Sequence, residues 1–302
     1  MSALADHASD QQTDATTGSS SIIGPTVIEP APSESSATER RTGRSGIPTT
    51  IISLLTVLAL FLAWWAASAY GSVSPVFLPS PIVVASSFWS LITTGFVDST
   101  LFQHLGASLG RVLGALAVSL VIGVPAGLLI ATSRVGRGVL DPIVEFLRPL
   151  PPLAYLPLII IWVGIGEASK ITVIALSMLP PIILSTSAGV RAVPKDFVNA
   201  ARSFGARPHQ VLLRVRVPAA LPSILTGVRI ALGTGWSTLV AAELVAATRG
   251  LGFMIQSAAQ FLVTDVVIAG IAVIAIVAFA LEWLARWIER RFVPWANPSR
   301  DR

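Results

Sequence analysis

Long apolar blocks separated by short polar segments constrain this chain more than any other feature of its sequence. Several of the blocks run for about 20 residues with little or no charge, which is the length that an α-helix needs to cross the ~30 Å hydrocarbon core of a bilayer. The chain is 53% hydrophobic and only 12% charged, and its mean hydropathy is +0.74. Because lipid offers backbone polar groups no water, such spans must be helical or closed barrels, and blocks of this length favour helices. The sequence therefore predicts an all-α integral membrane protein.

Six blocks predict six transmembrane helices. They lie at Pro48–Tyr70, His104–Ala131, Leu147–Gly164, Ile171–Val190, Leu221–Ala247 and Asp265–Arg286. A shorter apolar segment, Pro81–Gly95, has its large side chains near helical spacing and is too short to span. It predicts a helix that lies in the membrane interface.

The first 46 residues are polar and predict a disordered head. They are rich in Ser, Thr, Ala, Asp and Glu, and such a segment cannot bury enough apolar surface to offset the entropy of ordering. They contain no apolar core of the kind that a cleavable signal peptide needs, so the first span must itself act as the membrane signal. The chain then divides into a head (1–46), a six-span domain (47–295) and a short tail (296–302).

The basic residues set the expected orientation. With the N-terminus inside, sixteen of the 21 Lys and Arg residues fall in cytoplasmic segments, whereas the outer loops hold only Lys170 and Arg249. This asymmetry follows the positive-inside rule and places both termini and the loop 191–220 in the cytoplasm. The basic residues form no stripe, which argues against nucleic-acid binding. The absence of Cys excludes disulfides and thiolate metal sites, and the three His residues form no ligand-spaced pair.

The loop 191–220 is a polar, basic segment between the fourth and fifth spans, and its residues predict two short helices joined by a turn. It contains Asn199-Ala200-Ala201, three further residues, Gly205, nine further residues, and then Val215-Arg216-Val217-Pro218. The alanines favour a helix that packs closely on a partner, and Gly205 permits a turn that a Cβ would obstruct. Pro218 is expected to end the second helix before the fifth span begins.

This spacing resembles the E-A-A-x₃-G-x₉-I-x-L-P motif in the coupling loop of ABC importer permeases, with Asn199 in place of the leading Glu. From about Val76 to Trp295 the chain resembles the permeases for taurine, alkanesulfonates and nitrate, and the taurine permeases most of all. The segments that carry this resemblance are Leu140–Ile143, Arg148–Ala154, Trp162–Glu167, Gly235–Leu244 and Ala247–Gly252.

The resemblance implies the type I ABC importer permease fold, in a bacterial inner membrane. It also implies a homodimer that works with two cytoplasmic ABC ATPase subunits and an extracytoplasmic substrate-binding protein. ATP and Mg would be bound by the ATPase, since this chain has no G-x-x-x-x-G-K-[ST] sequence and is not expected to be an enzyme. The residues expected to couple the permease to the ATPase are Asn199, Ala200, Ala201, Gly205, Val215, Val217 and Pro218.

The substrate stays open at this stage. Taurine or a related sulfonate is the first expectation, and nitrate or another small organic anion is the alternative. An ion-coupled secondary transporter is a rival of another class, but such proteins often carry an internal repeat and ionisable groups near the membrane midplane. No repeat is visible in this sequence.

Polar residues inside the spans are candidates for a translocation path, because ionisable groups are costly in a membrane. Arg229, Trp236 and Glu243 are spaced by seven and fall on nearly one helix face. The other candidates are Arg148, Ser237 and Thr238. The alternative is that Arg229 reaches the membrane surface, that Glu243 pairs with Arg249 or Lys170, and that Trp236 packs in the protein.

Two further features of the second span leave alternatives. Arg111 could attract a sulfonate, but we expect it to extend to the membrane surface. Its glycines recur every four residues, which allows close helix packing either within one subunit or between two subunits. They are Gly106, Gly110 and Gly114, followed by Gly123 and Gly127.

Overall fold

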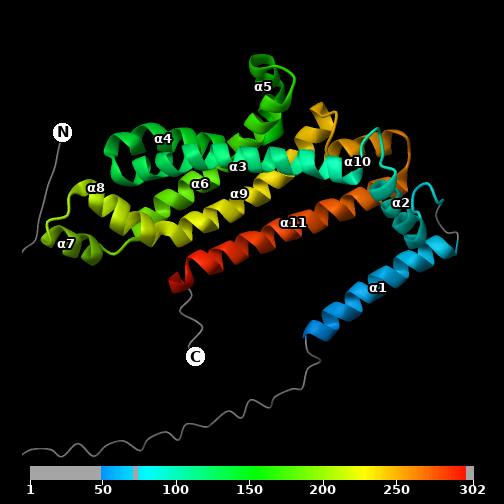
Figure 1. Ribbon diagram of the computed structural model, residues 1–302, viewed down its shortest axis with the longest axis horizontal. Helices are drawn as coiled ribbons and strands as arrows, with labels where there is room; N and C mark the ends of the chain where they lie inside the picture. The colour runs from blue at the N-terminus through cyan, green and yellow to red at the C-terminus, as the bar shows by residue number, and fades with distance from the viewer. Residues whose placement is uncertain (1–48, 71–73, 297–302) are drawn as a thin grey trace, which may run out of the picture. The chain divides into compact units, whose positions relative to one another are not determined.

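The computed structural model describes residues 49–70 and 74–296, and within these ranges every regular element is a helix (Figure 1). The predicted head (1–46) lies outside the described residues, as does all of the predicted tail after Ala296. Chain contacts divide the molecule after Ile52, and the packing described below belongs to the unit that begins at Ser53. The main helices are α1 (Thr49–Ala69), α2 (Pro81–Thr93), α3 (Leu101–Thr132), α4 (Arg134–Leu147), α5 (Leu156–Val163), α6 (Glu167–Ala192), α7 (Lys195–Ser203), α8 (Pro208–Val211), α9 (Val217–Ala246), α10 (Leu251–Gln260) and α11 (Thr264–Phe292).

The helices confirm an all-α membrane fold. Within the described residues, five helices are long and apolar enough to cross a membrane, and the number rises to six if a bent pair of helices counts as one span. Four of the five correspond to α1, α3, α6 and α11, and the fifth comprises α9 together with the turns before it. The predicted interfacial segment forms α2, whose first turn is capped by the Ser80 hydroxyl.

The predicted third span, Leu147–Gly164, is sharply bent, because its proline cluster does not allow a straight helix. The chain leaves α4 at Leu147, passes through a 3₁₀ turn (Pro152–Tyr155) and enters α5, and the two helical segments are bent by 99°. Three prolines, at 149, 151 and 152, stand at the bend and prevent a continuous helix there. Helix α5 has eight residues and is about 12 Å long, too short to cross a bilayer by itself.

Helix α4 was not anticipated, although its sequence signals it. The Ser133 side chain accepts a hydrogen bond from the Gly136 N–H and caps its start. Apolar residues then recur with helical spacing, and one of them, Val144, packs with Ile130 of α3 and Ile183 of α6. The helix is amphipathic rather than apolar throughout, which is why a search for long apolar blocks passed over it.

Helices α3, α6 and α9 form the centre of the bundle, and small residues let them approach closely. Gly189 of α6 faces Ser223 of α9, and Gly227 of α9 faces Ser185 of α6; an added Cβ at either glycine would lie 2.5 Å from the serine Cβ. Gly123 and Gly127 of α3 likewise pack on α6, which supports the intrasubunit alternative for that pair. An added Cβ at Gly106 or Gly110 would meet no atom within 4 Å, so those two glycines serve no close contact within the chain's described residues.

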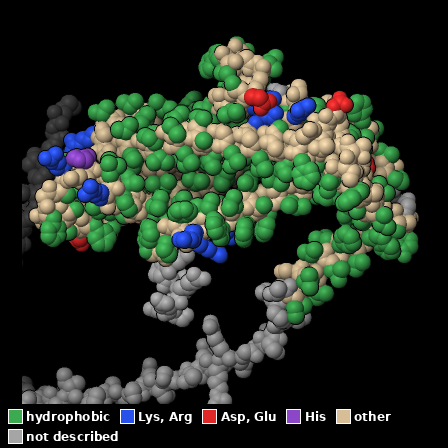
Figure 2. All heavy atoms as spheres, viewed as in Figure 1, with side chains coloured by type: hydrophobic (Ala, Val, Ile, Leu, Met, Phe, Trp, Pro, Cys, Tyr) green, Lys and Arg blue, Asp and Glu red, His purple; other side chains and the backbone are tan. Residues whose placement is uncertain are grey.

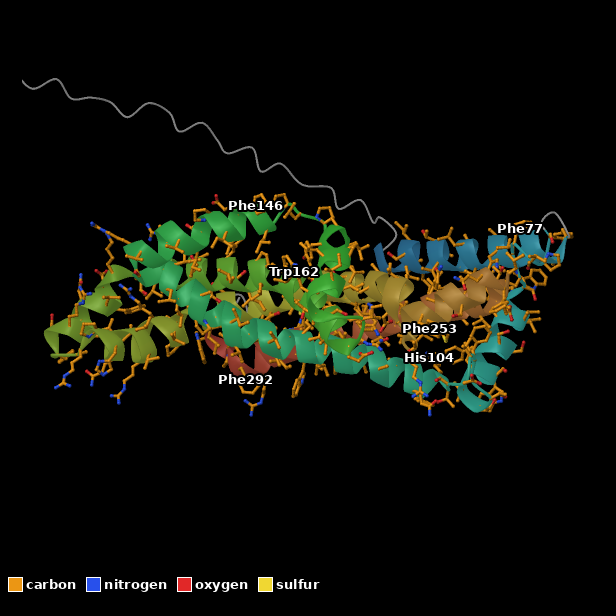
Figure 3. All side chains as sticks on the ribbon, turned by 90° about the horizontal axis from the view of Figure 1, so that it is seen from above. Phe77, His104, Phe146, Trp162, Phe253 and Phe292 are labelled. Carbon is orange, nitrogen blue, oxygen red and sulfur yellow. The ribbon has the colours of Figure 1, made fainter. Side chains whose placement is uncertain are left out.

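The surface of the bundle is apolar along the helices and basic at one end. Figure 2 shows hydrophobic side chains over the visible sides of α3, α4, α9 and α11, and Lys, Arg and His side chains gathered where α7 and α8 lie. Phe146, Trp162 and Phe292 project outward from α4, α5 and α11 (Figure 3), and all three are exposed. This distribution suits lipid or a protein partner along the sides and an aqueous phase at the basic end.

Candidate functional site

The predicted coupling loop forms a helix, a glycine turn and a second helix, as the sequence predicted. Helix α7 ends with Gly205 in the left-handed region, at φ +82°. The Gly205 N–H donates to the Arg202 carbonyl at 2.9 Å, and the Ala206 N–H donates to the Ala201 carbonyl at 3.1 Å. These two bonds are the Schellman pattern that ends many helices with a glycine. The role of Gly205 in this turn is therefore conformational.

Pro218 does not end the second helix, contrary to the prediction. Helix α8 passes through a π-helical turn (Leu212–Arg216) directly into α9, where Pro218 occupies the first turn. Proline has no N–H to donate, and the π-helical turn directly before it, where the Val217 N–H donates to the Leu212 carbonyl, shifts the hydrogen-bond pattern at this point. The result is one helical stretch from Pro208 to Val245, 38 residues long, with half-buried Val215 and Val217 inside it. The second helix of the loop and the fifth span are thus joined by continuous helical backbone.

The outer surface of this loop carries large apolar side chains. Phe197 and Phe204, seven residues apart around α7, are 59% and 93% exposed, and Leu213 beyond the turn is 61% exposed. Asn199 and Ala200 are also exposed and Ala201 is half-buried. Val198 of α7 and Val211 of α8 are buried. Exposed aromatic side chains among basic residues at a membrane protein's polar end are typical of a surface that binds another protein.

The face of α9 that carries Arg229, Trp236 and Glu243 turns into the bundle. Trp236 and Glu243 are buried, and Trp236 belongs to the main apolar core. Arg229 is partly exposed and pairs with Glu282 and Glu289 of α11, at 3.7 and 3.2 Å. This geometry supports the packing alternative for Trp236. It also separates Arg229 from Glu243, as their spacing in the sequence predicted.

Of the two hydroxyl candidates, Thr238 is buried and donates to the Thr234 carbonyl at 2.8 Å. Ser237 is exposed and donates to the Gly233 carbonyl at 3.2 Å. The side of α9 that stays open therefore carries Ile230, Gly233, Thr234 and Ser237, which are all exposed. Only Ser237 among the predicted path residues of α9 lies on that open side.

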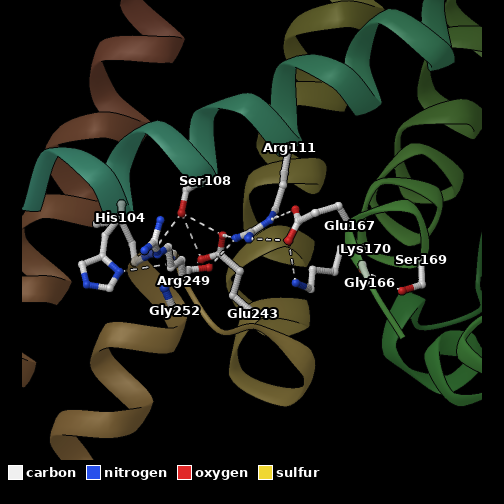
Figure 4. A network of polar contacts seen from close by, with 12 residues as sticks. His104, Ser108, Arg111, Gly166, Glu167, Ser169, Lys170, Glu243, Arg249 and Gly252 are labelled. Carbon is white, nitrogen blue, oxygen red and sulfur yellow. Dashed lines mark hydrogen bonds and ion pairs between the residues drawn. The ribbon is translucent and has the colours of Figure 1, made fainter. Parts of the chain in front are cut away.

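Glu243 belongs to a group of charged and polar residues that we call the polar clasp (Figure 4). Its members are Ser108, Arg111, Glu167, Lys170 and Glu243. The Arg111 guanidinium donates to Glu243 at 2.6 Å through Nη1 and binds Glu167 through Nε and Nη2 at 2.6 and 2.8 Å. Lys170 donates to Glu167 at 2.9 Å. Two cations balance two carboxylates, so the clasp joins α3, α6 and α9 without a net charge.

Two expectations about these residues are wrong. Arg111 does not extend to the membrane surface; its side chain is 4% exposed and lies between two carboxylates. Glu243 pairs with Arg111 and with neither Arg249 nor Lys170; Arg249 instead offers its backbone carbonyl to Arg111 at 2.7 Å. Ser108 and Glu167 were not among the residues predicted to have a role. An arginine well inside an apolar span was the available signal, because such a residue needs a carboxylate partner.

The chain between α9 and α10 closes over the clasp. The Gly252 N–H donates to Glu243 at 2.9 Å, and the Leu251 N–H donates to the Ser108 hydroxyl at 2.9 Å. Gly250 has φ +137°, and an added Cβ there would lie 2.4 Å from the Glu243 carboxylate. A side chain at this position would be both strained and sterically blocked.

His104 of α3 is hydrogen-bonded to the same segment. Its Nδ1 accepts from the Gly250 N–H at 3.2 Å, so its other nitrogen, Nε2, is free to donate to the Phe96 carbonyl at 3.1 Å. The fully buried ring also lies beside Phe253 (Figure 3), with ring centroids 6.4 Å apart. This pattern requires the neutral imidazole with its proton on Nε2.

Arg148 lies apart from the clasp, at the bend between α4 and the 3₁₀ turn. It lines a cleft of about 680 Å³ bounded by α4, the turn, α6 and α9. Across residues 49–70 and 74–296, no group of three or more His, Asp or Glu side chains converges as a metal site would require.

Comparison with known proteins identifies the family. Residues 123–294 match the family described as "Binding-protein-dependent transport system inner membrane component". The chain is 53% identical to the taurine transport system permease protein TauC of Escherichia coli (strain K12), over 81% of this chain and 89% of that protein. It is 38% identical to the putative aliphatic sulfonates transport permease protein SsuC of the same strain, over 80% and 90% of the two chains. It is 33% identical to the bicarbonate transport system permease protein CmpB of Synechococcus elongatus, again over 80% and 90%.

A solved structure agrees on the fold. A chain of the MetNI methionine ABC transporter in an inward-facing conformation superposes with a TM-score of 0.58 at 23% identity, over 64% of this chain and 95% of that one. At this identity the likeness concerns the fold alone. The family match and the relatives above 30% identity decide membership: this chain belongs to the inner membrane components of binding-protein-dependent transport systems, the permeases of ABC importers.

Proposed function

We propose that this chain is the transmembrane permease of an ATP-driven importer for taurine or a related sulfonate. The single observation that supports this choice of substrate is the 53% identity to the taurine permease, which extends over 81% of this chain. The next sulfonate relatives stand at 38%, and the bicarbonate permease at 33%. The ordering supports a sulfonate over nitrate or another small anion.

The proposed assembly is a homodimer of this chain with two cytoplasmic ATPase subunits and an extracytoplasmic binding protein. Three features support the ATPase and binding-protein partners: the family's dependence on a binding protein, the basic end formed by α7 and α8, and the exposed apolar side chains there. The homodimer is what the family resemblance implies. The positive-inside rule then puts this end and both termini in the cytoplasm. ATP and Mg belong to the ATPase subunits.

Coupling runs through the continuous helix that joins the loop to the membrane. A displacement of α7 and α8 is carried into α9, because no flexible segment separates α8 from α9. Helix α9 crosses α6 at the two glycine–serine contacts, Gly189 with Ser223 and Gly227 with Ser185. Close contacts between small residues transmit motion because the two backbones leave no room for side-chain adjustment. The residues assigned to this coupling are Asn199, Ala200, Ala201, Gly205, Val215, Val217 and Pro218.

The substrate is tested by reconstitution. The permease, its ATPase and its binding protein are placed in proteoliposomes, and the uptake of labelled taurine is measured with and without ATP. We expect ATP-dependent uptake that unlabelled ethanesulfonate reduces and that equal concentrations of nitrate or bicarbonate leave intact. Competition by nitrate or bicarbonate alone would move the assignment to those anions.

The coupling loop is tested at Gly205, where a non-glycine residue must adopt φ +82°. An added Cβ would meet no atom within 4 Å, so the cost in this chain is conformational, about 1–2 kcal/mol for a β-branched residue. We expect Gly205→Val to reduce co-purification of the ATPase and Gly205→Asn to retain it, since Asn tolerates the left-handed region. Equal ATPase recovery with both variants would show that the turn does not position the docking surface.

A further inference from the structure

Three arginines, Arg111, Arg148 and Arg229, fall within the membrane spans that the sequence predicts, and two of the three form ion pairs in the structure. Arg111 pairs with Glu167 and Glu243, and Arg229 pairs with Glu282 and Glu289. Arg148 has no carboxylate within ion-pair distance among the described residues. A guanidinium at membrane depth is costly unless something compensates it. Arg148 is exposed, so its guanidinium is open to an anionic partner from outside the described residues.

The surroundings of Arg148 are suited to a small anion. It lines the cleft of about 680 Å³, which is several times larger than a molecule of taurine's size requires. Hydroxyl-bearing side chains from three elements line the same cleft: Tyr155, Ser177, Ser185 and Thr234. Among the described residues no carboxylate lines it, so the charged groups that these residues present to the cleft are all cations.

The cleft is extended rather than compact. Along α6 its lining runs from Leu176 to Arg191, a rise of about 22 Å at 1.5 Å per residue. Arg191 stands near the end of α6 that leads into the coupling loop, and its guanidinium also has no ion-pair partner among the residues described. The opposite wall is the open side of α9, through Ile230 and Thr234. A groove of this length, with one arginine at its end and another along its course, is suited to the passage of a small anion.

We propose that this cleft is a subsite for the anionic head group of the substrate, with Arg148 as its main cation and Arg191 at its cytoplasmic end. The proposal rests on the assigned function and adds the position and chemistry of the substrate contact. A sulfonate offers three oxygens, to which the planar guanidinium can donate two parallel hydrogen bonds. Thr234 and Ser177 donate to backbone carbonyls of their own helices, so their hydroxyl oxygens keep lone pairs free for a substrate ammonium group. Both arginines are exposed, which keeps binding weak enough for the substrate to leave.

The chain's lack of Cys allows a direct electrostatic test. Thr234→Cys places one thiol, the cleft thiol, in the cleft of the detergent-purified permease. Ser90→Cys places another, the reference thiol, at an exposed position on α2. Each thiol is labelled with an anionic sulfonatoethyl methanethiosulfonate and with its cationic trimethylammonium counterpart. We expect the anionic reagent to be favoured at the cleft thiol relative to the reference thiol, and millimolar ethanesulfonate to slow labelling of the cleft thiol alone.

The role of Arg148 is tested by adding Arg148→Gln, Arg148→Lys or Arg137→Gln to the Thr234→Cys variant. If the Arg148 charge acts on the cleft thiol across about 6 Å of a water-like medium, its removal changes each labelling rate about threefold and their ratio about tenfold. Arg148→Gln should abolish the anion preference and the protection by ethanesulfonate, and Arg148→Lys should retain both. Arg137 is exposed on α4 and does not line the cleft, so Arg137→Gln should change neither. An unchanged ratio in Arg148→Gln, or no protection in the parent variant, overturns the proposal.

The transport assay separates this proposal from the proposed function. If the wild-type complex imports taurine and Arg148→Gln imports it equally well, the subsite is wrong and the function stands. If the wild-type complex imports another anion, and that anion protects the cleft thiol, the subsite stands and the taurine assignment is wrong. With both correct, Arg148→Gln lowers uptake at least severalfold while the stimulation of ATPase activity by the loaded binding protein persists.

Discussion

Arg111→Met tests whether the polar clasp holds α3, α6 and α9 together. The Glu243 side chain is fully buried, and the Arg111 side chain is 4% exposed. Removing the guanidinium leaves a buried carboxylate with only the Ser108 hydroxyl and the Gly252 N–H as donors. Breaking a buried ion pair from one side costs about 3–5 kcal/mol. We expect the free energy of unfolding to fall by about that amount.

A second substitution should restore part of the loss. Arg111→Met combined with Glu243→Gln removes both charges, and the new amide oxygen can still accept from the Gly252 N–H. The remaining cost is that of the hydrogen bonds that Arg111 made to other groups, about 1–2 kcal/mol. The double variant should therefore be more stable than Arg111→Met alone by about 2 kcal/mol. This is the opposite of the additive loss that independent sites would give.

The matched control is Arg286→Met, which breaks an exposed pair with Glu282 one helical turn away on α11. Exposed pairs of this kind contribute about 0.3–0.5 kcal/mol. Unfolding by SDS in mixed micelles, followed by the fluorescence of the eight Trp residues, measures the wild type and all three variants. An Arg111→Met loss no larger than that of Arg286→Met would refute the reasoning, as would additivity in the double variant.

Two other substitutions follow from the packing of α9. Gly227→Val places a Cβ 2.5 Å from the Ser185 Cβ and 3.1 Å from the Pro181 carbonyl oxygen. We expect the free energy of unfolding to fall by about 1–3 kcal/mol in the same assay. The control is Gly233→Ala, whose Cβ meets no described atom within 4 Å and should change the stability little. Trp236→Ala removes a buried core side chain and should cost about 3–5 kcal/mol, lowering membrane abundance, while stimulation of the ATPase by the binding protein persists in the protein that remains. A loss of that stimulation at unchanged stability would instead restore Trp236 to the translocation path.

The apolar blocks predicted most of the helices because the length of an uncharged segment is a local property. Helices α3, α6 and α11 extend the predicted spans by one to six residues at each end, because polar residues of a helix terminus lengthen a span beyond its apolar centre. The turn at Gly205 was predictable for the same reason, since its left-handed backbone depends on one residue type. The prolines at 149, 151 and 152 account for the break after Leu147 but not for its angle, because 99° depends on what α5 packs against.

By itself, the sequence determined the membrane class, the course of the main helices, the glycine turn and the residues that share a face of α9. Tertiary structure alone decided which face of α9 turns inward and which partner each arginine finds. A helical period places Arg229, Trp236 and Glu243 on one side of a cylinder, but the orientation of that side depends on neighbours that are distant in the chain. Glu243 meets Arg111 across 132 positions, whereas Arg148 meets no carboxylate among the described residues. The partners of charged side chains in a membrane protein are close in space but distant in the sequence. A charge without an ion-pair partner can therefore be identified only from the packed helices.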